Sequence, residues 1–150
     1  MLTLQPDSWS APGGSIVIDE RHSPVIWIRF FGVPSPTDFE AYLGALSRRL
    51  DREVRSVTVL DLTHSTGTSM DSTRAQARWI ADNRARLQRY GAATIFVFPS
   101  PGFRFALAAL LAISPLPGIF RVVGTADEAT SLANELVSTQ RLALHGGGEL

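Results

Sequence analysis

The stretch VTVLDLTHSTGTSMDSTRAQARW, residues 57–79, contains the pattern that decides the fold. Its first six residues are a short apolar run bounded by polar residues, which predicts an interior β-strand. A loop rich in serine and threonine follows, and the residues from Arg74 onward have the composition of a helix. A buried strand that leads into a helix in this way is the repeating unit of an α/β sheet.

The rest of the chain alternates in the same way. Besides residues 57–62, we predict strands at 15–20, 25–31, 93–98 and 120–123, the first two joined as a hairpin. We predict helices at 37–50, 74–90, 103–113 and 125–137, with capping boxes at Thr37–Glu40 and Thr125–Glu128 and a C-terminal cap at Gly91. The prediction is therefore an α/β fold in which about four helices cover a mixed, mostly parallel sheet of about five strands.

Length and composition limit the function. A chain of 150 residues fits one domain, with a core at about 15–138 and flexible or peripheral ends at 1–14 and 140–150. The chain has no cysteine, which excludes disulfides and thiolate chemistry, and its zero net charge gives no reason to expect nucleic-acid binding. No apolar stretch reaches the roughly 18 residues that span a bilayer, and the start does not look like a secretory signal. We expect a cytoplasmic protein without stable membrane insertion.

The crevice after the third predicted strand holds the candidate site, because ligands of such sheets bind beyond the carboxyl ends of parallel strands. Asp71 is the predicted N-cap of the next helix, with Ser72 and Thr73 in its first turn. Unpaired amides and the helix dipole would favour a phosphoryl group on Ser72. The alternative is that these residues are ordinary caps and turn formers with no further role.

The order of elements and the residues Met70, Asp71, Ser72 and Thr73 after Leu60–Leu62 resemble the STAS domain, the fold of bacterial anti-sigma-factor antagonists. The resemblance covers roughly residues 15–137. It implies a phosphoacceptor at Ser72 and a protein partner, either a regulator or a kinase. The STAS/SEC14-type branch also implies an apolar ligand.

Arginines near the crevice give a second candidate feature. Arg74 and Arg78 lie one helical turn apart, and Arg104 is the only charge in the apolar segment 103–113. These arginines form either a solvated face or a surface for an anion or an acidic partner. For segment 103–113 three environments remain open: burial against a second subunit, which makes us expect a homodimer, burial within one chain, or the wall of a lipid-lined pocket.

Catalytic patterns are weak. Asp61 and His64 could orient one another near Ser65 or Ser72, as in a catalytic triad, but the loop lacks the second glycine of a nucleophile elbow. We find no motif for a metal or a cofactor and expect none. The hypothesis we favour is a non-enzymatic signalling module that binds another protein through residues 64–73. The alternatives are a carrier of a small apolar or anionic ligand and, third, a small hydrolase that uses His64.

Overall fold

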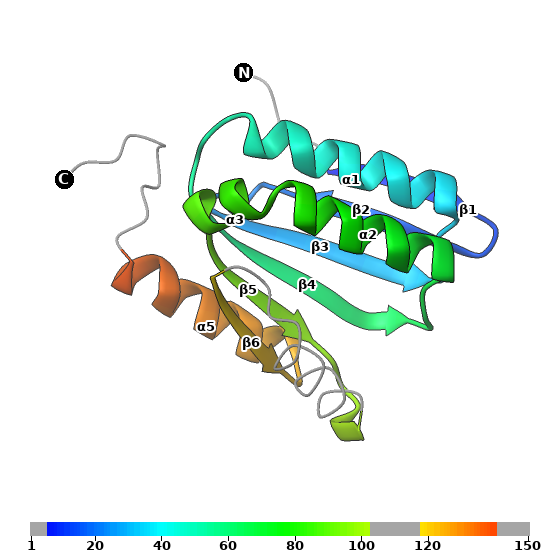
Figure 1. Ribbon diagram of the computed structural model, residues 1–150. Coiled ribbons are helices and arrows are strands. Elements are labelled where there is room, and N and C mark those ends of the chain that lie inside the picture. Colours follow the sequence, from blue (N-terminus) through cyan, green and yellow to red (C-terminus); the bar gives the residue numbers. More distant parts are fainter. Residues whose placement is uncertain (1–5, 103–117, 141–150) are drawn as a thin grey trace, which may run out of the picture.

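The computed structural model describes residues 6–102 and 118–140, which form one sheet with helices on both faces (Figure 1). The sheet has six strands in the order β1-β2-β3-β4-β5-β6. They are β1 (Asp7–Ala11), β2 (Gly14–Asp19), β3 (Val25–Gly32), β4 (Ser56–Ser65), β5 (Gly91–Val97) and β6 (Ile119–Val123). The pairs β1–β2 and β2–β3 are antiparallel and the other three are parallel, so the predicted mixed sheet with an N-terminal hairpin is confirmed.

Strand β1 was not predicted. Its sequence DSWSA carries little β-branched or apolar character, and it is ordered as an edge strand by pairing with β2, for example Trp9 opposite Ile16. Strand β4 is longer than predicted. After a register shift it continues beside β3, with His64 opposite Phe31 and Ser65 opposite Gly32, so His64 and Ser65 belong to the strand.

Three helices cover one face of the sheet: α1 (Pro36–Leu50), α2 (Met70–Asp82) and α3 (Arg84–Tyr90). The predicted helix 74–90 is thus two helices, because the backbone leaves the helical region at Asn83 (φ −111°, ψ 15°). The N-cap of α1 is Ser35, whose hydroxyl accepts from the amide of Asp38, and Pro36 holds the first helical position. The predicted capping box at Thr37 is therefore wrong.

The other face is covered by α5 (Ala126–Thr139). Its predicted cap is confirmed, because the Thr125 hydroxyl accepts from the Glu128 amide at 3.1 Å. The predicted helix 103–113, including Arg104, lies outside the described residues.

Two apolar clusters lie on opposite faces of the sheet, one on each face. Under α5, the β4 side chains Val57 and Val59 pack against β5 and the helix residues Ala129 and Ala133. On the other face the cluster is built from β2, β3 and α1, and its buried members are Ile16, Ile18, Ile28, Phe30, Phe39, Tyr42, Leu43 and Ala45. Alternation of side chains along each strand supplies both clusters from one sheet.

Candidate functional site

The turn between β4 and α2 lies at the carboxyl end of the parallel strands and is open to solvent. Thr66, Gly67 and Thr68 are exposed, and Met70 at the start of α2 is 67% exposed. The amide of Thr66 donates to the carbonyl of Gly32, which ties the turn to the end of β3. Gly67 has φ +146°, a conformation that favours glycine. The turn is thus anchored at its start and accessible along its length.

Ser69 is the N-cap of α2. Its hydroxyl accepts from the Ser72 amide at 3.0 Å and donates to the Ser72 hydroxyl at 3.0 Å, while the Thr73 hydroxyl donates to the Ser69 carbonyl. The prediction of Asp71 as the cap is wrong, since Asp71 lies exposed in the first turn. Ser72 is only 2% exposed, whereas Thr73 is exposed. The first turn of α2 therefore presents Asp71 and Thr73 to solvent and encloses the Ser72 hydroxyl.

Among the described residues, Asp61 and His64 each contact other side chains and form no hydrogen bond or ion pair with each other. The Asp61 carboxylate accepts from the amide and hydroxyl of Thr63 and lies 4.0 Å from the Nε of Arg29. The His64 ring stacks on Phe31, with centroids 5.6 Å apart and planes 6° from parallel. Asp61 serves to fix the end of β4 and to balance Arg29, and this arrangement contains no Asp–His–Ser relay.

Arg74 and Arg78 lie on the solvent face of α2. Both are exposed, and no ion pair among the described residues involves either of them. By contrast, Arg86 on α3 pairs with Asp51 at 2.6 Å. The two guanidinium groups are thus available to an acceptor outside the chain.

A cavity of about 720 Å³ opens beside the turn, between α2 and the sheet. Its hydroxyl rim is formed by Thr63, Ser65, Thr66, Thr68, Thr73 and Ser100. Four of these lie in the predicted segment 64–73, whereas Thr63 and Ser100 were not predicted. A second cavity of about 220 Å³ lies toward the amino ends of the strands. Both contact the same five residues, Tyr42, Leu60, Gln76, Ile80 and Phe96. The period-two pattern of β4 could have placed Leu60 on this face, but the position of α2 above it is not a property of the local sequence.

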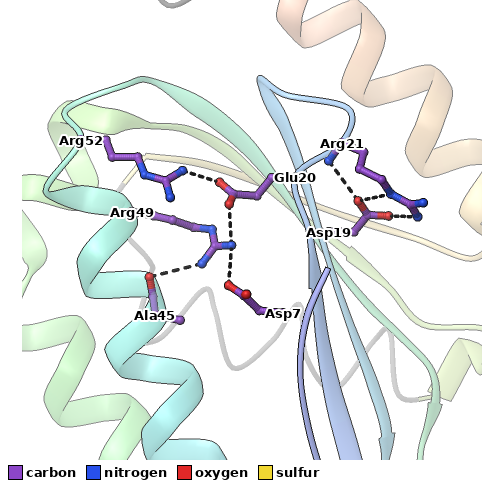
Figure 2. Close-up of polar contacts among 7 residues, drawn as sticks. All are labelled: Asp7, Asp19, Glu20, Arg21, Ala45, Arg49 and Arg52. Carbon is purple, nitrogen blue, oxygen red and sulfur yellow. Dashed lines mark hydrogen bonds and ion pairs between the residues drawn. The ribbon is translucent and has the colours of Figure 1, made fainter. Parts of the chain in front are cut away.

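A network of charges lies away from this turn, at the other end of the sheet (Figure 2). Arg49 of α1 donates to Asp7 of β1 and Glu20 of the β2–β3 turn, and Arg52 also donates to Glu20. Arg21 forms two side-chain hydrogen bonds to Asp19, which lower the pKa of that carboxyl to about 2 although its burial opposes the shift. These pairs tie α1 to the hairpin and contribute to the fold.

No group of side chains among residues 6–102 and 118–140 could hold a metal ion. No helix in these ranges is long and apolar enough to cross a bilayer.

Comparison with known proteins decides the fold. Two solved structures superpose over most of the chain. A protein of the DUF3478 family from Shewanella loihica PV-4, described as having a SpoIIAA-like fold, matches with a TM-score of 0.64 over 89% of this chain and 98% of its own. The fold of this chain is SpoIIAA-like. An anti-sigma factor antagonist from Mycobacterium paratuberculosis matches with a TM-score of 0.53 over 84% of this chain and 99% of its own.

The SpoIIAA-like fold confirms the predicted STAS-like architecture. Sequence identities are 13% and 16%, and at that level the likeness concerns the fold alone. No protein-family model matches the sequence, and no curated protein matches it.

Proposed function

We propose that this chain is a non-enzymatic protein-interaction module of the STAS type that acts in bacterial signalling. We define the turn–α2 surface as Thr66, Gly67, Thr68, Met70, Arg74 and Arg78, and we propose that it binds the partner. The observation that carries the proposal is the exposure of a capped, hydroxyl-rich turn beside a helix whose Arg74 and Arg78 form no ion pair within residues 6–102 and 118–140. The structural neighbour that is an anti-sigma factor antagonist supports the general class.

The chemistry of this surface indicates the kind of partner. Arg74 and Arg78 favour carboxylates, because a guanidinium donates two parallel hydrogen bonds to such a group. Met70 adds an exposed, adaptable apolar side chain next to them. The partner we propose is therefore a protein with an acidic patch around an apolar centre. We also propose that the chain acts in the cytoplasm.

We also propose that modification at Ser72 controls this surface. A phosphoryl group there would add about −1.5 to −2 charges at the amino end of α2. Because the Ser72 hydroxyl is enclosed by Ser69, transfer to it requires the first turn of α2 to open. Modification would then favour the opened turn, so the switch would act by disrupting the surface.

A pull-down from cell lysate tests this proposal. The bait proteins are the parent chain, the double variant Arg74→Glu/Arg78→Glu and the control Arg48→Glu, which reverses an exposed charge on α1. We expect the double variant to lose the partner that the parent and the control retain. If all three retain the same proteins, the turn–α2 surface is not the binding site. Ser72→Asp compared with Ser72→Ala tests the switch separately, and equal partner sets would exclude it.

The cavities between α2 and the sheet favour a second candidate function, a carrier of a small apolar ligand. Their shared wall is mainly apolar and the rim near the turn consists of uncharged hydroxyls. This composition suits a neutral headgroup on a hydrocarbon body better than an anion. Native mass spectrometry of the purified full chain checks it, since a carrier retains a bound mass that denaturation removes.

A further inference from the structure

Charge is separated between the two faces of the molecule. Helices α2 and α3 together contain five arginines and two aspartates, whereas α5 contains Asp127, Glu128 and Glu135 and no basic residue. The two helical layers cover opposite faces of the sheet (Figure 1). A chain with zero net charge thus has a basic side and an acidic side.

Each side has charged groups that form no ion pair with the residues that the structure describes. Arg74 and Arg78 are exposed without an ion pair among the described residues, and Asp127 and Glu135 are in the same state on α5. Glu128 differs, because its carboxylate accepts from the Gly124 amide and the Thr125 hydroxyl. Asp127 and Glu135 are therefore the acidic groups that a second molecule can reach.

Both helices also expose small side chains. Buried Ala129, Ala133 and Leu136 turn Asp127, Ser131, Glu135 and Ser138 toward solvent. On α2 the exposed small side chains are Ala77, which lies between Arg74 and Arg78, and Ala81, which follows Arg78 by three residues. Both faces have small central side chains, which lets two helices approach closely. Arg74 and Arg78 span about 6 Å along α2, and Asp127 and Glu135 span about 12 Å along α5, so the two basic groups fit between the two acidic ones.

We propose that a second copy of this chain docks its α5 on the α2 face of the first, with Asp127 and Glu135 paired to Arg74 and Arg78. The two faces belong to opposite sides of one molecule, so the contact is head-to-tail and leaves a free face at each end. Repetition of this head-to-tail contact would produce an open, linear assembly. The contact depends on exposed ion pairs and is therefore weak and sensitive to salt.

One consequence rests on the proposed function. Arg74 and Arg78 also belong to the turn–α2 surface, so a docked copy would compete with the partner for the same guanidinium groups. Dilution or a rise in salt would free the surface. The contact between copies itself does not depend on the identity of any partner.

Sedimentation velocity of the purified full chain tests the contact. At an ionic strength of about 0.01 M, where the Debye length is about 30 Å, we expect species larger than a monomer that dissociate at about 1 M. The variants Arg74→Glu/Arg78→Glu and Asp127→Arg/Glu135→Arg should each weaken association by about tenfold or more at low salt. The control Arg48→Glu should behave as the parent, and circular dichroism checks that each variant is folded.

Mixing the two double variants is the decisive experiment for the proposed contact. One variant is acidic on both faces and the other is basic on both faces, so an equimolar mixture restores opposite charges at every contact. We expect the mixture to associate although neither variant does so alone. A parent chain that is monomeric at low salt, or a mixture that stays monomeric, overturns the proposal. A parent chain that self-associates but captures no partner in the pull-down would contradict only the proposed function.

Discussion

The side-chain oxygens of Ser69 and Ser72 lie 3.0 Å apart in the first turn of α2, and the Ser69 hydroxyl also accepts from the Ser72 amide. One residue thus caps the helix and closes over the other, which is 2% exposed. The turn that precedes them is open to solvent. The Ser69 side chain therefore affects both the stability of α2 and the solvent accessibility of the Ser72 hydroxyl.

Ser69→Ala removes the cap. We expect it to lower the free energy of unfolding by about 1 kcal/mol, because the first-turn amides lose their acceptor. Urea denaturation measures the change. Thr68→Ala, an exposed neighbour, is the control and should stay within about 0.5 kcal/mol of the parent. Equal effects of the two substitutions would show that Ser69 is not the cap.

Ser72→Asp places a carboxylate in an enclosed position. We expect it to cost about 1–3 kcal/mol, because burial of a charge that lacks a full set of partners outweighs the favourable helix dipole. Thr73→Asp, one residue on and exposed, should be tolerated. Thermal and urea unfolding compare the two variants. If Ser72→Asp is as stable as the parent, the side chain at position 72 is not enclosed in the folded chain.

The Asp19–Arg21 pair gives stability that depends on pH. The pKa of Asp19 is lowered to about 2 in the folded chain, against about 3.9 in an unfolded one. Its contribution is therefore present above about pH 4 and is lost as the pH falls through about 2. Arg21 is 54% exposed at its side chain, so we expect Asp19→Asn to cost only about 1–2 kcal/mol at pH 7. Urea titrations of parent and variant should converge toward pH 2, and a difference that does not change with pH would contradict this account.

The network of Figure 2 allows a matched comparison of two arginines that share Glu20. The side chain of Arg49 is 10% exposed and that of Arg52 is 62% exposed. Arg49→Met leaves Glu20 and Asp7 without this partner, and we expect a loss of about 1–3 kcal/mol together with faster amide exchange in β1. Arg52→Met should cost about 0.5 kcal/mol or less. If the order is reversed, Arg49 does not hold β1 to α1.

The sequence was sufficient to predict the interior of the fold. The apolar run at the start of β4 predicted a strand, and Val57 and Val59 are fully buried. The Thr125 cap was also predictable, because a local pair of residues three apart is all that it requires. Features that depend on local pattern or on dense apolar character were thus within reach of the sequence.

Features that depend on contacts between residues distant in sequence could not be predicted from the sequence. Strand β4 extends through Ser65 because β3 continues beside it. The cap of α2 is Ser69 and not the expected Asp71. Both residues are good caps, so composition could not choose between them. Burial of Ser72 follows from that choice. The break at Asn83 differs, because the pair Asp82-Asn83 has low helix propensity and was a local signal for a helix end.

Site-specific photocrosslinking tests the turn–α2 surface most directly. A photoreactive residue replaces Met70, which is 67% exposed, and in a second chain it replaces exposed Arg48 of α1 as the control. After irradiation in cells, we expect Met70 to yield an adduct with a different protein that Arg48 does not yield and that Arg74→Glu/Arg78→Glu abolishes. Adducts of two copies of the chain would be distinguished by mass. If Met70 and Arg48 give the same adducts, or Met70 gives none with another protein, the turn–α2 surface is not where this chain meets its partner.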